Sequence, residues 1–453
     1  MLTPEDFGLV ALASVYIAFL SIFVEQGFGD AIVQYPQIDR EDLDTAFWTS
    51  LAFSVALSAG TILFASPIAH LFHEPALVGV IRWLSLSFIS IALSSTQQAI
   101  LRRELRFKEL AIRTMLASLL GGIAGIIMAV AGYGVWSLVG QTLITSAAGV
   151  FVLWTVSDWR PGFRYSLPHF KGLFDFGSKM IVTNIANFFN RRLDDLLIGL
   201  FLGPTALGYY TIAYRLIQVL TQVFTSATTA VAFPAFSRIQ HDDARLRRAF
   251  MQAISLTSMF AFPTFIGVSV LAPQIVLFIY GPQWENSIPV MRILPYIGII
   301  HVTLYFHSAL LLAKGKPDWR MLLALVHTAA NVLFFAVSVR WGIVAVATAY
   351  VLQGYLLFPV DIWVTQKTLP FSLGKYLSRL AAPAISAVIM GFAITLMQQV
   401  RLISPSVLFT GQHLLIQLIV LGLTGAIIYG ICIVIFDRKA LSDIQLLARS
   451  TVK

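Results

Sequence analysis

Long apolar runs without charged residues recur along the whole 453-residue chain and constrain its fold more than any other feature. Only 12% of the residues are charged, against about 25% in soluble domains. A membrane-spanning helix needs roughly 20 apolar residues, and its backbone groups must be paired within the segment. The two-residue alternation that is typical of a β-barrel is absent. The sequence therefore predicts an all-α polytopic membrane protein.

Charged residues, proline and glycine divide these runs into thirteen predicted membrane-spanning helices. The predicted spans are residues 7–33, 46–72, 77–100, 110–131, 134–156, 174–200, 206–234, 248–271, 288–312, 317–339, 342–366, 376–399 and 412–436. The single cysteine, Cys432, lies in the last span, which excludes an internal disulfide and a cysteine-ligated metal site.

Lysine and arginine residues gather in the loops on one side of the predicted spans, which hold 24 of the 31. The opposite loops hold only Arg82, Arg292, Arg340 and Arg401. Basic loops face the cytoplasm, so we expect the C-terminal tail, residues 437–453, to be cytoplasmic. The net charge of +9 then reflects topology and contact with anionic membrane lipids, and not a nucleic-acid partner. The expected lipid-contacting loop carries Arg102, Arg103, Arg106 and Lys108.

The chain repeats itself with an offset of about 200 residues. The pattern L-x-P-x-x-x-G-x-x-x-x-A occurs at residues 2–13 and again at residues 202–213. Two further pairs follow in the same order, Ser66-Pro67-Ile68 with Ala272-Pro273-Gln274 and Arg82-Trp83-Leu84 with Arg292-Ile293-Leu294. Two parallel repeats are a common plan for transporters. The repeat therefore predicts two pseudo-symmetric lobes of six helices plus a terminal helix pair.

The second copy of the repeat begins after a helix, residues 174–200, whereas the first copy begins the chain. We therefore expect the first of fourteen helices to be missing before Met1; a genuine thirteen-helix protein is the alternative. The predicted divisions are a lobe over 1–156, a cytoplasmic linker over 157–173, a second lobe over 174–366, the terminal pair over 376–436 and the tail.

Four motifs carry a family resemblance. They are L-T-P-E-D-F-G-L-V-A-L-A from Leu2, F-V-E-Q-G-F-G-D-A-I-V-Q from Phe23, N-R-R-L-D-D-L-L-I-G-L-F-L-G-P-T-A-L-G-Y-Y from Asn190, and Y-G-P-Q-W from Tyr280. The chain resembles the polysaccharide-transporter branch of the multidrug/oligosaccharidyl-lipid/polysaccharide flippase superfamily. The resemblance implies fourteen helices around a central cavity, in a multi-pass protein of the bacterial inner (plasma) membrane.

The resemblance also implies a function. The expected activity is translocation of an undecaprenyl-pyrophosphate-linked oligosaccharide from the cytoplasmic to the periplasmic leaflet by alternating access, for O-antigen, capsule or exopolysaccharide synthesis. We expect no enzymatic activity, no cofactor and no metal. The expected partners are the lipid-linked substrate, the polysaccharide polymerase machinery and a coupling ion, H⁺ or Na⁺. We expect the protein to be a monomer.

A polar stripe on the predicted span 174–200 provides the main candidate substrate site. At about 100° per residue, an arc of roughly 80° contains Asn184, Asn187, Arg191 and Asp195. Asp194 and Arg192 flank this arc. Polar and ionisable residues inside a membrane usually line an aqueous path or pair with one another.

Arg191 and Arg215 lie at equal sequence distances from Gly203, which predicts a similar membrane depth for both. Guanidinium groups bind phosphate through paired hydrogen bonds. We therefore expect these arginines, with Arg192, to bind the substrate pyrophosphate, and the aspartates to hold the arginines when substrate leaves. A fixed intramembrane ion-pair network is the alternative. Tyr214 is a candidate for stacking on sugars.

Three further ionisable residues, Glu25, His301 and His327, lie within predicted spans and are candidates for gating or ion coupling. Histidine titrates near neutral pH, so proton coupling is one role, but helix packing is the favoured role of both histidines.

Two other classes of function remain open. A cation-coupled multidrug exporter of the same superfamily would favour a carboxylate-rich cavity over an arginine-rich one. A membrane glycosyltransferase or polymerase would need an acid/base constellation outside the spans, and the longest outer loop offers only Glu285. The G-x-x-x-x-G-K-[ST] phosphate-binding motif is absent.

Overall fold

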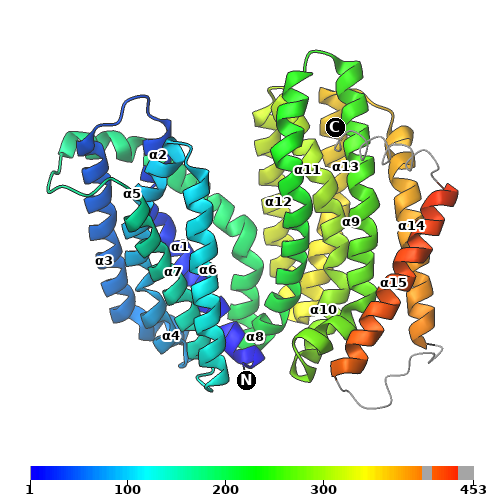
Figure 1. Cartoon of the computed structure of the whole chain (residues 1–453), viewed down its shortest axis with the longest axis horizontal. Helices are drawn as coiled ribbons and strands as arrows, with labels where there is room; N and C mark the ends of the chain where they lie inside the picture. Colours follow the sequence, from blue (N-terminus) through cyan, green and yellow to red (C-terminus); the bar gives the residue numbers. More distant parts are fainter. Residues whose placement is uncertain (1, 400–410, 437–453) are drawn as a thin grey trace. The chain divides into compact units, whose positions relative to one another are not determined.

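The computed structural model describes residues 2–399 and 411–436, and all regular secondary structure in this part of the chain is helical, as predicted (Figure 1). Twelve of its helices are long and apolar enough to cross a membrane. One of them, in α8 (Leu167–Arg238), extends over 60 residues and contains Gly203, whose φ of 82° and ψ of 175° are not helical. Gly203 therefore separates two spans, which brings the described helices to the thirteen that the sequence predicts.

The contacts divide the chain into two compact units, and the first ends at Thr211. In this unit α1 packs against α3, α4, α5 and α7, and α5 packs against α2, α3 and α7. Helices α1 and α5 therefore form its centre. The unit contains the beginning of α8 and α1 (Pro4–Glu25), α2 (Phe28–Gln34), α3 (Arg40–Leu71), α4 (Leu77–Leu84), α5 (Ser87–Arg103), α6 (Phe107–Val130) and α7 (Val135–Val156).

The second unit begins at Ile212. Helix α9 packs against α11, α14 and α15, and α13 packs against α11 and α12. The unit contains the end of α8 and α9 (Asp243–Ile279), η1 (Pro282–Ser287), α10 (Ile288–Ile293), α11 (Pro295–Ala313), α12 (Pro317–Ser338), η2 (Val339–Trp341), α13 (Ile343–Thr368), α14 (Leu373–Gln399) and α15 (Gly411–Phe436).

The beginning of α8 packs on the first unit. Phe188 joins the cluster around Val15 and Ile22 of α1, and Leu173 joins the cluster around Phe28 of α2. This packing is the reason that the contacts divide the chain at Thr211, whereas the sequence divides the lobes at residues 157–173. The lobe boundaries concern the repeat and remain a prediction, and the predicted tail over 437–453 lies outside the described residues.

The helices expose many large apolar side chains and bury some polar ones, which is unusual for a soluble protein. On α3, Ser50, Ser54 and Ser58 recur every four residues and are buried, which places them on one face of the helix. Large apolar side chains such as Leu63 on α3 and Val130 on α6 are 74% and 84% exposed. The outer surface is therefore suited to lipid.

Helix breaks occur at corresponding places in the two halves. The spans predicted as 77–100 and 288–312 are each two helices, separated at Ser85–Leu86 and at Leu294. The first break directly follows the motif Arg82-Trp83-Leu84, and the second lies at the last residue of the motif Arg292-Ile293-Leu294. Pro295, which has no N–H to donate, begins α11. In the first half the hydroxyl of Ser85 donates to the carbonyl of Arg82 at 2.7 Å.

Candidate functional site

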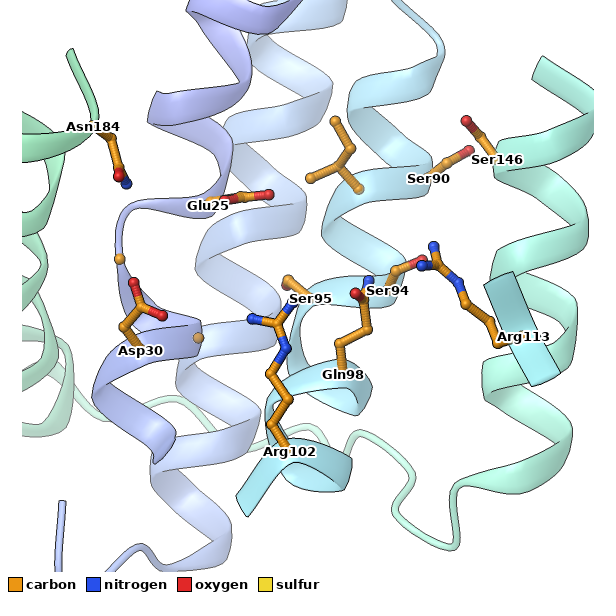
Figure 2. Close-up of a pocket in the computed structure, with 13 residues that line it drawn as sticks. Glu25, Asp30, Ser90, Ser94, Ser95, Gln98, Arg102, Arg113, Ser146 and Asn184 are labelled. Carbon is orange, nitrogen blue, oxygen red and sulfur yellow. The ribbon is translucent and has the colours of Figure 1, made fainter. Parts of the chain in front are cut away.

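A polar pocket lies within the first unit, where α1, α2, α5, α6, α7 and α8 contribute side chains (Figure 2). Its volume is about 290 Å³. Charged groups are costly inside a membrane domain and mark candidate functional sites. The polar residues that line the pocket are Glu25, Asp30, Ser90, Ser94, Ser95, Gln98, Arg102, Arg113, Ser146 and Asn184.

A backbone break between α1 and α2 brings Glu25 and Asp30 to this pocket. The sequence predicts one helix over 7–33, but Gln26 and Gly27 adopt left-handed conformations with φ of 48° and 69°. A Cβ at Gly27 would lie 2.9 Å from the Cα of Gly177 on α8. Glycine is therefore needed both for the turn and for the close passage of α8. Figure 2 shows the two carboxylates on either side of the break.

The pocket also receives two arginines, Arg102 from the last turn of α5 and Arg113 from α6. Within the described residues neither guanidinium makes an ion pair or a hydrogen bond, and the Nε of Arg113 is buried without a partner. Arg113 also lies against Gly149 of α7, where a Cβ would be 2.9 Å from its Nη2. The pocket therefore holds two guanidinium groups that form no ion pair or hydrogen bond with the described residues.

Neighbouring arginines of the α5–α6 loop have different roles. Arg103 donates to the carbonyls of Ile32 and Tyr35, at 2.6 Å each, and thereby holds the end of α2. Arg106 pairs with Glu109 at 3.1 Å. The sequence assigns Arg102, Arg103 and Arg106 alike to lipid headgroups, whereas the structure gives two of them protein partners and directs Arg102 into the pocket.

The predicted polar stripe on α8 is only partly brought to this pocket. Asn184 lines it, whereas Asn187, Arg191 and Arg192 are exposed. Arg192 pairs with Asp195 at 3.0 Å, a contact that fits both the substrate site and the fixed ion-pair network.

Asp194 has a different partner from the one that the sequence suggests. It accepts a hydrogen bond of 3.0 Å from the hydroxyl of Tyr210, and both residues are buried. Tyr214 and Arg215 belong to the second unit, where the ring of Tyr214 lies 6.3 Å from that of Tyr350 and Arg215 is exposed. The common depth of Arg191 and Arg215 therefore remains a prediction.

The second unit contains the two candidate coupling histidines. His327 on α12 lies 3.0 Å from a carboxylate oxygen of Asp361 and 3.1 Å from the amide nitrogen of Gln353, both on α13. The ring of His301 contacts that of Tyr350 at 5.9 Å. Asp361 is absent from the residues that the sequence singles out, although a lone carboxylate inside a predicted span is the same signal that selects Glu25.

One group of side chains in the described part of the chain is compact enough to hold a metal ion. Asp39, Asp42 and His169 place ligand atoms within 4.8 Å of one another. The two aspartates form the capping box at the start of α3, in which each carboxylate accepts the backbone N–H of the other residue. Helix capping therefore accounts for this arrangement.

Comparison with known proteins places the chain in a family. Residues 1–289 match the family described as "Polysaccharide biosynthesis protein". The succinoglycan biosynthesis transport protein of Rhizobium meliloti is 27% identical over 99% of this chain and 90% of its own length. The teichuronic acid biosynthesis protein of Bacillus subtilis is 24% identical over 86% of this chain and 82% of its own length.

Solved structures show the same fold. A lipid II flippase in an inward closed conformation superposes with a TM-score of 0.74, covering 97% of this chain and 98% of the flippase at 16% identity. An inward-facing multidrug resistance transporter of the multidrug/oligosaccharidyl-lipid/polysaccharide (MOP) superfamily gives a TM-score of 0.62, covering 81% of this chain and 92% of that transporter at 19% identity. The chain is thus a multi-pass membrane protein that belongs to the polysaccharide biosynthesis protein family.

Proposed function

We propose that this chain translocates an undecaprenyl-pyrophosphate-linked oligosaccharide from the cytoplasmic to the periplasmic leaflet of a bacterial inner membrane. The observation that carries the proposal is the polar pocket of the first unit, in which Arg102 and Arg113 make no hydrogen bond or ion pair with the residues that the structure describes. The chain changes no covalent bond of its substrate and hands it to the polysaccharide polymerase machinery. The relatives named for succinoglycan transport and teichuronic acid biosynthesis support this role.

The chemistry of the pocket suits a phosphate group. A guanidinium group offers paired N–H donors that match phosphate oxygens, and its interaction with an anion is stronger where water is scarce. The volume of about 290 Å³ is at the lower limit for small-molecule pockets, about 300–1,000 Å³. The pocket therefore fits the phosphates of a headgroup, while the lipid chain and the sugars remain outside it.

Glu25 and Asp30 supply the means of release. They lie on the break between α1 and α2, and Figure 2 shows them across the pocket from Arg113. When phosphate is absent, these carboxylates balance the charge of the two arginines. When phosphate is bound, they repel it, so the site binds the headgroup without trapping it.

Charge in the loops gives the direction of transport. Arg102 lies at the end of α5, beside the loop that belongs to the basic side of the chain. Under the positive-inside rule this side is cytoplasmic, as is the C-terminus. The substrate therefore enters from the cytoplasmic leaflet, and alternating access of the two lobes releases it on the other side. Arg191, Arg192 and Arg215 are proposed as further contacts along this path.

A multidrug exporter that is coupled to a cation is the second candidate, because Glu25 and Asp30 also offer carboxylates to a positive ligand. The two functions predict opposite effects of charge in the pocket. An exporter of cations should tolerate neutral residues at Arg102 and Arg113, whereas a flippase for an anionic headgroup should not.

Complementation of a deletion strain tests the proposal. We expect Arg102→Gln and Arg113→Gln each to reduce surface polysaccharide at least about tenfold, since a charge-assisted hydrogen bond is worth about 1.5–3 kcal/mol, with accumulation of lipid-linked oligosaccharide in the inner leaflet. Arg320→Gln on α12 is the matched control, because Arg320 is exposed and lies far along the chain from the pocket. All variants must be present in the membrane at wild-type amounts.

Two results would contradict the proposal. Full export by the Arg102→Gln, Arg113→Gln double variant would exclude phosphate binding by this pocket. A deletion strain that keeps its surface polysaccharide but becomes sensitive to cationic dyes would identify a multidrug exporter instead.

A further inference from the structure

A cluster of buried polar side chains joins α12 to α13 within the second unit. Nε2 of His327 lies 3.0 Å from Oδ2 of Asp361, and Nδ1 of the same ring lies 3.1 Å from Nε2 of Gln353. Asp361 and Gln353 are 5% and 2% exposed. Among the described residues, His327 is the only ion-pair partner of Asp361. Both nitrogens of one imidazole ring are thus occupied by polar groups of the neighbouring helix.

These partners determine where the protons of His327 lie. The amide nitrogen of Gln353 is a donor only, so Nδ1 accepts its hydrogen bond and carries no proton. Nε2 then carries the proton and donates to Asp361, since a carboxylate only accepts. The ring is therefore neutral beside an ionised carboxylate, and the pair has a net charge of −1.

A second histidine in the same unit is arranged differently. The hydroxyl of Thr365 donates to the backbone carbonyl of Asp361 at 2.7 Å, so its oxygen accepts from Nδ1 of His307 at 2.8 Å. Nε2 of His307 then accepts from the hydroxyl of Tyr376 at 3.0 Å. Both nitrogens of His307 are therefore hydrogen-bonded in a neutral ring. The backbone carbonyl oxygen of Asp361, which accepts from Thr365, links these hydrogen bonds to Asp361.

We propose that His327 and Asp361 form a proton-binding site of this transporter, which takes up one proton on Nδ1 of His327. The side-chain amide of Gln353 then rotates by about 180°. Its oxygen accepts a hydrogen bond from the new N–H at Nδ1, where its nitrogen donated before. Uptake converts the pair from a net charge of −1 to a neutral imidazolium–carboxylate pair. This inference rests on the proposed transport function, because it names the proton as the coupling ion.

The surroundings favour uptake at this ring and not at its neighbours. Among the described residues, His301 of α11 interacts electrostatically with His327, and Tyr376 of α14 with Asp361. Neither carries a charge as a neutral ring or phenol, so neither then opposes an imidazolium at His327. The His327 side chain is 22% exposed, against 7% for Asp361, so the ring is the more accessible member of the pair.

The donor set is unsuited to a metal cation such as Na⁺. Hard cations take about six or more oxygen ligands, whereas the centre of this cluster is an imidazole that faces one carboxylate oxygen and one amide nitrogen. In the described residues, the group that meets the spacing for a metal is Asp39, Asp42 and His169, in the first unit. The cluster on α12 and α13 is thus built for a proton.

Solid-state NMR of the full-length chain in lipid bilayers, with ¹⁵N-labelled histidine, tests the site without any substrate. The chain has 8 histidines, and His327→Gln assigns the resonances of interest by their loss. We expect one protonated ring nitrogen at alkaline pH and two at acidic pH. His307 should keep one protonated nitrogen throughout, because its hydrogen-bonded chain fixes both nitrogens.

Variants of Asp361 separate a proton site from a packing contact. Asp361→Asn should lower the midpoint by about one unit or more, a tenfold loss of proton affinity, because the carboxylate no longer stabilises the imidazolium. Asp361→Glu should retain the titration. Asp318→Asn, an exposed carboxylate at the start of α12, is the matched control and should leave the midpoint unchanged. A His327 ring that stays neutral over the whole range, or an equal midpoint in wild type and Asp361→Asn, would overturn the proposal.

The same variants in the complementation strain test coupling. Asp361→Asn should abolish export, whereas Asp318→Asn should support it. Wild-type export by Asp361→Asn would overturn the coupling role. If the wild-type chain itself fails to restore polysaccharide, the proposed function is wrong, and the NMR titration still decides whether the proton site exists.

Discussion

Gly8 on α1 lies directly against the carbonyl oxygen of Pro204 on α8, and a Cβ at Gly8 would overlap this oxygen. The contact is reciprocal, because Gly208 lies in the same way against the carbonyl oxygen of Pro4. Both pairs belong to the repeated pattern L-x-P-x-x-x-G, separated by 200 residues. The two copies of the repeat therefore cross each other at their own first turn, with the local symmetry of a two-fold axis.

This crossing predicts that Gly8→Ala destabilises the fold. The obstructing atom belongs to the backbone and cannot rotate away, so we expect overpacking to cost about 1–3 kcal/mol and the Tm of the detergent-solubilised protein to fall. Gly122→Ala on α6 is the control, because no atom lies within 4 Å of its Cβ position and alanine is the better helix former. Equal Tm values for wild type and Gly8→Ala would show that the two helices separate without cost.

Tyr210→Phe should destabilise the first unit through Asp194. The substitution leaves a buried carboxyl without its hydroxyl donor, which costs about 1–3 kcal/mol. Tyr16→Phe is the matched control, since the hydroxyl of Tyr16 bonds to that of Thr61 at 3.1 Å, and such a neutral pair is worth about 0.5–1.5 kcal/mol. Thermal unfolding of both variants measures the difference. A smaller effect for Tyr210→Phe than for Tyr16→Phe would contradict the assignment of the Asp194 partner.

Arg103→Gln and Arg102→Gln should separate stability from transport. Arg103 holds the carbonyls of Ile32 and Tyr35, so its loss should increase hydrogen–deuterium exchange in α2 and lower the Tm. Arg102 has no such bonds, and its loss should leave exchange and Tm unchanged while export falls. If both variants lose stability equally, Arg102 has a structural role that its position in the pocket does not explain.

The start of α3 should respond to acid. The backbone N–H of Asp42 donates to Asp39 at 2.8 Å, and this bond lowers the pKa of the Asp39 carboxyl from its ordinary value. Asp39 lies just outside the membrane-spanning helices. Since the pKa is lower in the folded state, the carboxylate stabilises this turn above the ordinary aspartate pKa of about 3.9. That contribution is lost as the pH falls through the folded value.

Hydrogen–deuterium exchange of the peptide around Asp42 measures this response. At each pH the wild type is compared with Asp39→Asn, which corrects for the intrinsic pH dependence of exchange and keeps a good helix cap. We expect the wild-type turn to be the better protected near neutral pH and to lose this advantage on acidification. A difference that stays constant with pH would refute the role of the ionised carboxylate.

The sequence by itself determined the spans, because a membrane-spanning helix depends on local composition and on backbone bonds within its own segment. It also located the repeat whose first turns cross at Gly8 and Pro204, and it singled out Glu25 for gating and Asn184 for substrate binding, two residues that line one pocket in the structure. The sequence did not predict the helix breaks at Gln26–Gly27 and at Ser85. They depend on neighbours distant in sequence, such as Gly177 against Gly27.

Only the tertiary structure decided which charged groups meet. Arg102 and Arg103 are adjacent and chemically identical, yet one enters a pocket and the other holds α2, because consecutive residues of a helix point in directions about 100° apart. His327 and Asp361 are 34 residues apart on different helices, and their contact depends on how α12 packs against α13. Hydropathy records whether a residue belongs in a span, but the partner that makes a buried charge useful is a property of the packed helices.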